Sequence, residues 1–252
     1  MDIVLIGAGG RMGHSLRQVI DEQGDQLVGA VAATPDKLNI VAPCADRLTP
    51  TMLQAEVLID FSTPQGTEQT IETLEQAPNA LAYVVGTTGL SEQTQERLKN
   101  LARRHAVLYT ANTSIGITVM KALATQAAKM LPGYDIDIGE MHHSRKVDAP
   151  SGTALTLGDA VAQARGAQNT GSTDRAGTRK ENTIGYAVMR GGTVAGEHTV
   201  VFSGPYERLE IIHRAQDRTI FARGALRAAA WLLQNPPGFY EMNDVLGVAR
   251  TP

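Results

Sequence analysis

The stretch "MDIVLIGAGGRMG", residues 1–13, decides the fold of the first part of the chain. Its second to sixth residues form an apolar run of strand length, and a glycine-rich turn follows them directly. Glycines in such a turn let the backbone approach a pyrophosphate closely, and the N–H groups that open the following helix attract the anion. The stretch therefore predicts the strand, turn and helix of a dinucleotide-binding site.

The spacing of the glycines departs from the usual dinucleotide pattern. The turn reads GxxGxxG with one extra glycine, whereas the usual GxGxxG would place its third glycine at Met12. A glycine-rich turn is weak support by itself, because any tight strand-to-helix connection uses glycine. Its place after an apolar strand strengthens the dinucleotide interpretation. We therefore expect this glycine-rich turn to lie against the pyrophosphate of a dinucleotide.

Short apolar runs alternate with helical patterns as far as residue 113. The runs cover residues 2–6, 27–33, 56–61, 81–86 and 106–110. The helical patterns cover roughly residues 11–22, 64–76 and 91–104. Nearly continuous apolar strands that alternate with helices are typical of a parallel sheet covered on both faces. The pattern predicts a doubly wound α/β domain of the Rossmann type.

The pattern changes after Thr113. A helix, a strand and a second helix are expected at 115–131, 134–141 and 152–165, followed by a polar, glycine-rich loop at 166–182. Three strand-like runs without intervening helices come next, at 183–192, 194–204 and 206–215. They predict a smaller α+β domain with a mixed or antiparallel open sheet. The last helix, about 219–234, and the tail after it fit either domain.

Composition and charge narrow the class of protein. The 252 residues suffice for one large or two modest domains, and 42% hydrophobic with 19% charged residues is typical of a soluble globular protein. A net charge of -3 gives no electrostatic reason to expect nucleic acid or a membrane surface as a partner. The single cysteine, Cys44, excludes an intramolecular disulfide and fits a reducing compartment. We expect a cytoplasmic protein without a cleaved leader or a bilayer-spanning segment.

The end of the second strand bears on cofactor preference. Residues 30–37 read "AVAATPDK", so no acid stands at Ala33 or Thr34, where NAD-binding proteins usually have one. Without a carboxylate to repel a 2′-phosphate, the Thr34 hydroxyl, Lys37 and Arg11 are available to it. The aspartate two positions after Thr34 keeps NADH open. The sequence therefore predicts NADPH or NADH, with a slight preference for NADPH or dual use.

Two further strand ends carry small polar residues, in "VVGTTG" (84–89) and "YTANTS" (109–114). Open α/β sheets bind ligands at the carboxyl ends of their strands. Such residues also cap helices and make turns, and both roles can hold together. We expect the nicotinamide side of the cofactor site to include Gly86, Thr87, Thr88, Ala111 and Asn112.

The segment "EMHHSRKVDAPSGTA", residues 140–154, concentrates the chemistry of the second domain. His142 and His143 are adjacent rather than four residues apart and no cysteine is near, so we expect no metal. Lys146 and a helix start at residues 151–153 together offer a positive charge, backbone N–H groups and two hydroxyls to a carboxylate. A histidine beside them can give or take a proton near neutral pH. The segment predicts a proton donor next to an anion clamp.

A regular strand constrains the two histidines. Neighbouring residues on a strand point to opposite faces. If both His142 and His143 contact the substrate, the strand must therefore end at or before Met141.

At these motifs the chain resembles the 4-hydroxy-tetrahydrodipicolinate reductases, also called dihydrodipicolinate reductases. "GAGGRMG", "VVGTTG" and above all "EMHHSRKVDAPSGTA" carry the resemblance, which continues through "TIGYAVMRGG", "GEHTVVFSG" and "ERLEIIHRA". The resemblance implies a Rossmann domain, residues 1–113 completed by 225–252, and a substrate-binding domain, residues 114–224, whose sheet also forms a homotetramer. It implies NAD(P)H-dependent reduction of a cyclic imine dicarboxylate, after loss of water, in the diaminopimelate route to lysine.

The resemblance also implies roles for single residues. His142 would be the proton donor and Lys146 the second catalytic group. Substrate contacts would come from His143, Ser151, Gly152 and Thr153. Cofactor contacts would come from Gly7, Ala8, Gly9, Gly10, Arg11, Met12, Ala33, Thr34, Gly86, Thr87, Thr88, Thr110, Ala111, Asn112 and Thr113. The chain departs from the family at three of these positions: an acid is frequent at Ala33 and an arginine occurs at Thr34, and an aromatic residue is common at Thr113.

Other functions fit these residues less well. Semialdehyde-type dehydrogenases need a cysteine nucleophile, and Cys44 has no histidine near it in sequence. Another NAD(P)-dependent imine or amino-acid dehydrogenase of the same architecture is the better alternative. A nucleotide-binding sensor would keep the glycine turn but would not need the histidine segment.

Four residues elsewhere are interpreted mainly as structural. Asp60 is expected to fix the turn after its strand, with a cofactor-side contact open. His198 and His213 lie in expected strands and are interpreted as packed or surface residues rather than ligands. Trp231 is expected in the core.

Overall fold

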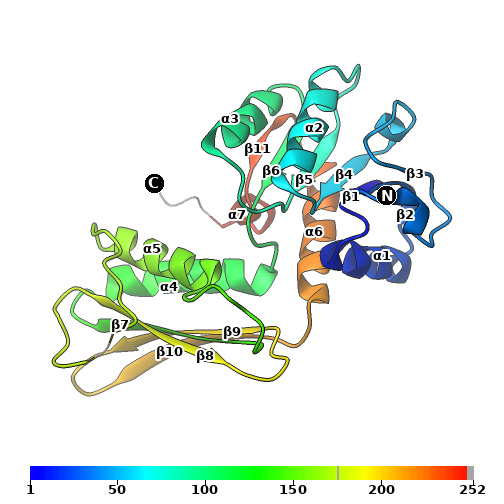
Figure 1. Ribbon diagram of the computed structural model, residues 1–252. Helices are drawn as coiled ribbons and strands as arrows, with labels where there is room; N and C mark the ends of the chain where they lie inside the picture. Colours follow the sequence, from blue (N-terminus) through cyan, green and yellow to red (C-terminus); the bar gives the residue numbers. More distant parts are fainter. Residues whose placement is uncertain (175, 249–252) are drawn as a thin grey trace. The chain divides into compact units, whose positions relative to one another are not determined.

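The computed structural model describes residues 1–174 and 176–248. Residue 175 of the expected loop and residues 249–252 of the expected C-terminal segment lie outside this range. The chain forms two compact units, the first from Met1–Ile115 together with the segment from Arg218 onward, the second from Gly116–Asp217 (Figure 1). Residue 225, where the chain was expected to return to the first domain, falls inside helix α6 (Thr219–Leu232), and this whole helix belongs to the first unit.

A seven-stranded parallel sheet forms the centre of the first unit, in the order β11-β6-β5-β4-β1-β2-β3. Its strands are β1 (Asp2–Ile6), β2 (Gln26–Val31), β3 (Cys44–Ala45), β4 (Val57–Asp60), β5 (Ala82–Val85), β6 (Ala106–Tyr109) and β11 (Gly238–Tyr240). The doubly wound parallel sheet expected from the sequence is confirmed. The tail returns to this unit, because β11 pairs with β6.

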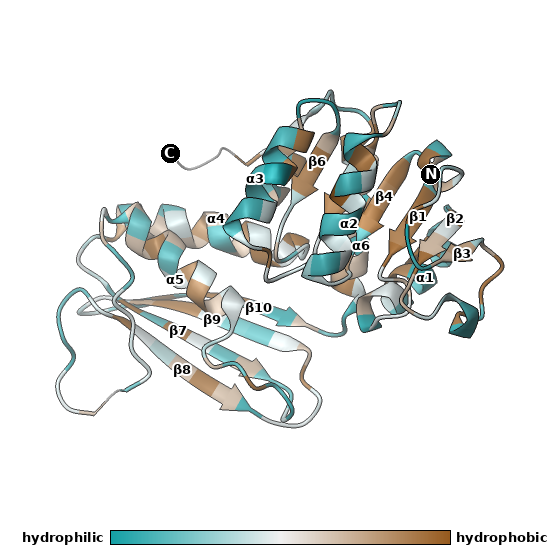
Figure 2. Ribbon diagram, turned by 45° about the horizontal axis from the view of Figure 1, so that its top comes forward, coloured by the Kyte–Doolittle hydropathy of each residue, from teal (hydrophilic) through white to brown (hydrophobic). Residues whose placement is uncertain are grey.

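Helices cover both faces of this sheet. They are α1 (Arg11–Gln23), α2 (Pro64–Glu75), α3 (Glu92–Leu101), α6 and α7 (Met242–Val245), with short 3-10 turns at Pro35–Lys37 and Met52–Gln54. Alternate residues of β1 serve the two cores: Ile3 and Leu5 pack with α1 and α6, whereas Val4 and Ile6 pack with α2 and α3. Burial on both faces explains why these strands are apolar throughout (Figure 2).

The second unit is a four-stranded mixed sheet with helices on one face (Figure 1). The strands, in the order β10-β9-β7-β8, are β7 (Asp135–His142), β8 (Ile184–Arg190), β9 (Gly196–Ser203) and β10 (Arg208–Ala215). Only β7 and β8 run parallel among these neighbours. The helices are α4 (Ile115–Met130) and α5 (Gly152–Ala164), and their apolar residues pack on the buried face of β7 and β9.

The polar segment 166–182 is attached to this sheet by several contacts, among them a hydrogen bond of 2.7 Å from the Asn169 amide to the hydroxyl of Tyr186 in β8. Ser172 forms a parallel bridge with Gly185, and the guanidinium of Arg179 pairs with Asp135 at 3.0 Å and with Asp137 at 2.9 Å. Within the described residues, no helix has the length and apolar character needed to cross a membrane.

Candidate active site

The buried face of β7 changes from apolar to ionisable along the strand. Ile136 and Ile138 are in the core, and the next two residues on the same face are Glu140 and His142, both buried. β7 ends at His142. The earlier strand end, at or before Met141, that contact of both histidines with the substrate was expected to require is therefore not observed. The expected end at or before Met141 is wrong because the ladder still pairs His142 with Arg190 of β8.

Glu140 is held as an ionised carboxylate although only 1% of it is exposed. The guanidinium of Arg190 donates to Oε1 at 2.9 Å, and the backbone N–H of Ser151 lies 3.1 and 3.2 Å from the two oxygens. Burial by itself raises the pKa of this carboxyl. The hydrogen bonds from Ser151 and Arg190 outweigh burial and hold the pKa of Glu140 below its usual range.

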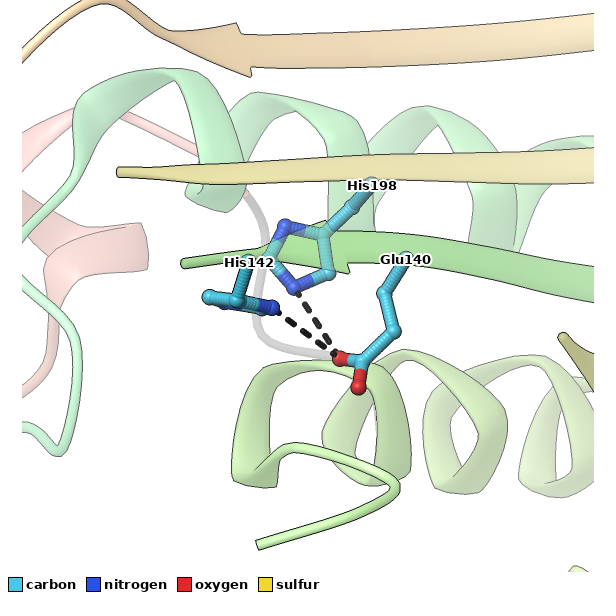
Figure 3. Close-up of side chains that lie close together, drawn as sticks. All are labelled: Glu140, His142 and His198. Atoms are coloured by element: carbon cyan, nitrogen blue, oxygen red, sulfur yellow. Dashed lines mark ion pairs between the residues drawn. The ribbon is translucent and has the colours of Figure 1, made fainter. Parts of the chain in front are cut away.

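Two histidines face the other oxygen of Glu140 (Figure 3). Nδ1 of His142 lies 3.7 Å from Oε2, and Nε2 of His198 lies 3.8 Å from it, both just beyond hydrogen-bond distance. The two rings meet edge to face, with centroids 5.1 Å apart. Burial and the neighbouring His142 lower the pKa of His198 to about 4, so this ring is neutral near pH 7.

His142 is also neutral near pH 7 in the unliganded protein. Burial lowers the pKa of its imidazole below the ordinary value, and the nearby Glu140 carboxylate opposes that shift. The cations of Lys146 and Arg190 lower the pKa further. An anion that arrived beside these cations would offset their effect and favour the protonated ring.

Within the described residues, Glu140, His142 and His198 also form a grouping of potential metal ligands. Their ligand atoms all lie within 4.8 Å of one another. The grouping spans β7 and β9, so the adjacent histidine pair in the sequence gives no sign of it. Arg190 is bound to the same carboxylate at 2.9 Å, and its positive charge opposes a divalent cation there. The charges favour a hydrogen-bonded carboxylate over a metal ligand.

Lys146 lies on the turn that follows β7. Its backbone N–H donates to the carbonyl of His143 at 3.1 Å, and its ammonium pairs with the half-exposed Asp148 at 2.8 Å. Arg190 donates to the backbone carbonyl of Asp148 at 2.6 Å, which ties this turn to β8. The cation expected beside the histidines is therefore present, together with an acidic partner that the sequence interpretation did not include.

Ser151 is turned into the protein, whereas its two successors are not. Its hydroxyl caps α5 by accepting from the N–H of Ala154 at 3.2 Å, and its own N–H is bound to Glu140. Only 2% of Ser151 is exposed, so it anchors the helix to β7 rather than presenting its polar groups outward. Gly152 is exposed and Thr153 is half-buried.

The glycines of the first turn differ in whether the structure requires glycine, and for what physical reason. Gly7 has φ +83°, and a Cβ there would lie 2.4 Å from the carbonyl oxygen of Phe61. A Cβ on Gly13 would lie 2.4 Å from the carbonyl oxygen of Gly7, so these two positions exclude any side chain. Gly9 has room for one. Gly10 is the N-cap of α1, which has neither a side-chain cap nor an acidic residue in its first turn, and its N-terminal N–H groups are suited to an anion.

A cavity of about 510 Å³ lies beside this turn, within the first unit. Residues lining it include Gly7, Gly9, Gly10, Ala33, Thr34 and Arg47. Arg47 follows the short strand β3, the neighbour of β2, and sequence reasoning missed it because β3 has only two residues. Arg11 and Lys37 are not among the lining residues. Ala8 is buried and Met12 half-buried, and β2 ends at Val31, two residues before the expected end.

Asp60 connects the carboxyl ends of β4 and β5. It accepts hydrogen bonds from the hydroxyls of Ser62 at 2.6 Å, Tyr83 at 2.7 Å, Thr67 at 2.9 Å and Thr87 at 3.0 Å. The Ser62 N–H donates to it at 2.9 Å, which is the turn-fixing role expected from the sequence. Burial raises the pKa of Asp60 although these hydrogen bonds oppose it.

The expected nicotinamide-side residues have unequal exposure. Thr87 is buried and bound to Asp60, whereas Thr88 is exposed. Gly86 has no room for a side chain, because a Cβ would lie 2.3 Å from the ring of Phe61.

The second expected group, residues 110–113, is similarly divided. Thr110 is half-buried, and its hydroxyl donates to the Asn112 carbonyl at 2.9 Å, while Ala111 is exposed. Thr113 is buried and donates to the carbonyl of Phe221 in α6 at 2.7 Å, so its side chain serves the packing of that helix.

The remaining expectations concern His198, His213 and Trp231. His213 lies in β10, as expected, and is half-buried. His198 is packed, as expected, but it is packed against His142. The signal that could have found it is the alternation of β9, where His198 precedes the core residues Val200 and Phe202 on one face. Trp231 is half-buried against the first core and stacks edge to face on Tyr240.

Comparison with known proteins identifies the family. Models of the N-terminal and C-terminal parts of dihydrodipicolinate reductase match residues 1–113 and 116–246. A 4-hydroxy-tetrahydrodipicolinate reductase of Rhodopseudomonas palustris (strain BisA53) is 42% identical over 270 residues, covering 99% of this chain and 98% of the relative. One of Halorhodospira halophila is 42% identical over 267 residues, covering 98% and 99% respectively.

Solved structures agree in fold. A dipicolinate-bound dihydrodipicolinate reductase from Paenisporosarcina sp. TG-14 superposes with a TM-score of 0.79 at 22% identity, covering 96% of this chain and 97% of that one. An aspartate dehydrogenase from Thermotoga maritima has a TM-score of 0.54 at 13% identity, covering 92% and 96%. Because both family models match and full-length relatives share two fifths of their residues with it, the chain belongs to the dihydrodipicolinate reductase family of oxidoreductases.

Proposed function

We propose that the chain reduces the dehydrated form of 4-hydroxy-tetrahydrodipicolinate to tetrahydrodipicolinate with NAD(P)H, and that His142 donates the proton. The observation that carries this proposal is the end of β7, where a buried imidazole lies beside a fixed carboxylate and two cations. The cofactor, when bound, supplies the hydride. The protein must then deliver one proton to the reduced ring and hold a dicarboxylate in place.

Lys146 and the start of α5 are the proposed carboxylate clamp. The ammonium of Lys146 supplies a full charge, and the N–H groups of Gly152 and Thr153 lie at the positive end of the helix. His143 is the proposed further contact although β7 extends to His142, because it lies just after the strand, where the alternation of side chains no longer fixes the face to which it points. A bound dianion would compensate Lys146 and Arg190 and raise the pKa of His142, so that the ring becomes protonated when the substrate is present. The dipicolinate in the Paenisporosarcina structure supports a dicarboxylate as the ligand.

The first unit is the proposed dinucleotide-binding domain, and the second the proposed substrate domain. The turn residues 7–12 fit a pyrophosphate, since Gly7 and Gly13 have no room for side chains and the N-terminus of α1 is uncapped by any side chain. The exposed or half-buried residues Thr88, Thr110, Ala111 and Asn112 are proposed for the nicotinamide side.

A preference for NADPH, or use of both cofactors, is proposed from the residues that line the cavity beside the glycine turn. Thr34 and Arg47 line it where a 2′-phosphate would lie, at the carboxyl ends of β2 and β3. The carboxylate of Asp46 lies 3.5 Å from Nε of Arg47, and its negative charge opposes a phosphate there. Michaelis constants for the two cofactors test this proposal. Arg47→Gln should raise the constant for NADPH severalfold and leave that for NADH nearly unchanged; a wild-type protein with a strong NADH preference would contradict it.

We propose that the protein forms a homotetramer through the uncovered face of the second unit's sheet. The cytoplasm is its proposed location. α4 and α5 cover one face, while Met189 and Ile212 on the other are 54% and 44% exposed. A second copy that paired with this face would bury them. Sedimentation of wild type and of Met189→Glu/Ile212→Glu tests this, with smaller particles expected for the variant.

The activity itself is tested by following cofactor absorbance with the cyclic substrate. His142→Gln should lower kcat by about 10²–10⁴-fold with little change in KM, because it removes the acid and leaves the clamp. Lys146→Ala should impair both constants. Near-normal turnover in both variants would contradict the assignment. Oxidation of amino acids with no turnover of the cyclic imine would favour the alternative, an amino-acid dehydrogenase, whose fold the Thermotoga structure shares.

A further inference from the structure

Glu140 has no place in the roles proposed so far, although it lies at the centre of the site. It is two residues before His142 on the same buried face of β7. A carboxylate in such surroundings is costly unless its partners hold it firmly. Its presence beside the proposed proton donor therefore calls for a functional explanation.

Hydrogen bonds from two elements hold this carboxylate: Arg190 reaches it from β8 and the Ser151 N–H from the start of α5. The ladder places His198 of β9 opposite Glu140. Most of the hydrogen bonding falls on Oε1, so Oε2 remains directed at the two histidines. The carboxylate cannot turn away without losing the Arg190 and Ser151 contacts.

The nitrogen of His142 that faces Glu140 is the inner one. Nδ1 is buried and makes no hydrogen bond, and Oε2 lies 3.7 Å from it. The other nitrogen, Nε2, lies beside Gly196, where an added Cβ would come within 3.2 Å of it. A contraction of less than 1 Å on protonation would convert the Nδ1 contact into a charge-assisted hydrogen bond. The neutral ring of His198 packs against His142 from the side.

We propose that Glu140 is the positioning residue for His142: its carboxylate orients the ring through Nδ1 and stabilises the imidazolium, leaving Nε2 to carry the transferred proton. Arg190 has the opposite electrostatic effect on the ring while it keeps Glu140 in place. The proposal deepens the proposed function, since it rests on His142 as the proton donor.

Glu140 and Arg190 should shift the pKa of His142 in opposite directions. The groups that face His142 are Glu140 on β7, His198 on β9, Arg190 on β8, and Lys146 with Asp148 on the intervening turn. Removal of the Glu140 charge should make the ring a weaker base. Removal of the Arg190 charge should make it a stronger one, because the carboxylate would then act without a competing cation.

NMR titration of the histidine rings tests this without any assay of activity. The six histidines allow the His142 resonance to be assigned from the His142→Gln spectrum. In Glu140→Gln the pKa of His142 should fall below its wild-type value, and in Arg190→Gln it should rise above it. The control, Glu181→Gln, removes a carboxylate from an exposed residue of the same unit and should leave the titration unchanged. A His142 titration that is the same in wild type and Glu140→Gln overturns the proposal.

Kinetics separate positioning from simple structural support. If His142 must be protonated, activity falls as pH rises through its pKa in the complex, so the basic limb of kcat should move to lower pH in Glu140→Gln and to higher pH in Arg190→Gln. We expect kcat of Glu140→Gln at neutral pH to fall about tenfold or more with KM changed much less. Equal losses in kcat and KM without movement of the limb would indicate a structural role only.

Two more variants cover the case in which Glu140→Gln does not fold. Glu140→Asp keeps the charge and should keep the basic limb near its wild-type position. Glu140→Gln/Arg190→Gln removes both charges of the pair, and its His142 titration should fall between those of the two single variants. If the NMR shifts appear as expected but His142→Gln retains activity, the positioning holds and the proposed function fails.

Discussion

Asp60 at the end of β4 and Glu140 near the end of β7 are both almost fully buried carboxyls, yet their partners differ in charge. Asp60 accepts from four hydroxyls and one backbone N–H, all neutral. Glu140 accepts from a guanidinium and a backbone N–H. The pKa of Asp60 is raised by burial, whereas that of Glu140 is lowered because its hydrogen bonds outweigh burial.

The difference shows what neutral donors can and cannot do for a buried acid. Hydroxyls satisfy the lone pairs of Asp60 but do not return the solvation lost on burial, so the protonated form gains. A guanidinium supplies a compensating charge and keeps Glu140 ionised. Asp60 therefore suits a structural junction, and Glu140 suits a permanent negative charge beside a histidine.

The largest effect expected on stability comes from Glu140→Gln. Loss of the carboxylate leaves Arg190, one fifth exposed, without its ionic partner, and the free energy of unfolding should fall by about 3 kcal/mol. Urea unfolding at neutral pH measures it. The double variant Glu140→Gln/Arg190→Gln should recover part of the loss, and a larger loss in the double variant would contradict the ion-pair explanation.

Asp60→Asn should cost less, about 1–2 kcal/mol, since no cation loses its partner. The hydroxyls of Ser62, Thr67 and Thr87 can rotate to accept from the new amide group. The same urea experiment on this variant gives the comparison directly. If Asp60→Asn destabilised the protein more than Glu140→Gln, the charge of the donors would not be the deciding difference.

A single hydroxyl should matter less again. Thr67→Val keeps the shape of the side chain and removes one donor to Asp60, so a loss of about 1 kcal/mol is expected. Thr156→Val, on the exposed side of α5, is a matched control whose hydroxyl bonds only the preceding turn. Equal losses in the two variants would mean that Asp60 does not depend on this donor.

The smallest expected effect is a difference in how the free energy of unfolding depends on pH. Glu140, with a lowered pKa, contributes stability that is present above its unfolded value of 4.5 and is lost as pH falls through the folded value. Asp60, with a raised pKa, stabilises the folded state most when protonated, so its contribution is lost as pH rises. The stability gap between wild type and Glu140→Gln should narrow in acid. The gap for Asp60→Asn should widen there, and parallel curves would remove the distinction.

Local patterns in the sequence were enough for most of the fold. A continuous apolar run located β1 at Asp2–Ile6 and a helical pattern located α2 from Pro64, because each depends on neighbouring residues alone. The short β3 and the return point of the chain at residue 218 were missed, since two residues carry no periodicity and domain membership depends on packing.

The candidate site was predictable only where it is local. His142 and Lys146 lie in one segment, so sequence reasoning reached them. Glu140 stood in the same segment without a role, although the alternation of a strand puts it on the face of His142. Arg190 and His198 join them through the pairing of β7 with β8 and β9, and strand register between distant segments is not encoded in any local pattern.

The return of the chain through α6 and β11 has a consequence for synthesis. The first unit lacks the core residues Ala225, Leu226 and Leu232 and the edge strand beside β6 until its last residues are made. The second unit is continuous from residue 116 to 217. On the ribosome, the second unit can therefore complete its core before α6 is made, whereas the face of the first sheet that α6 covers is completed only afterwards.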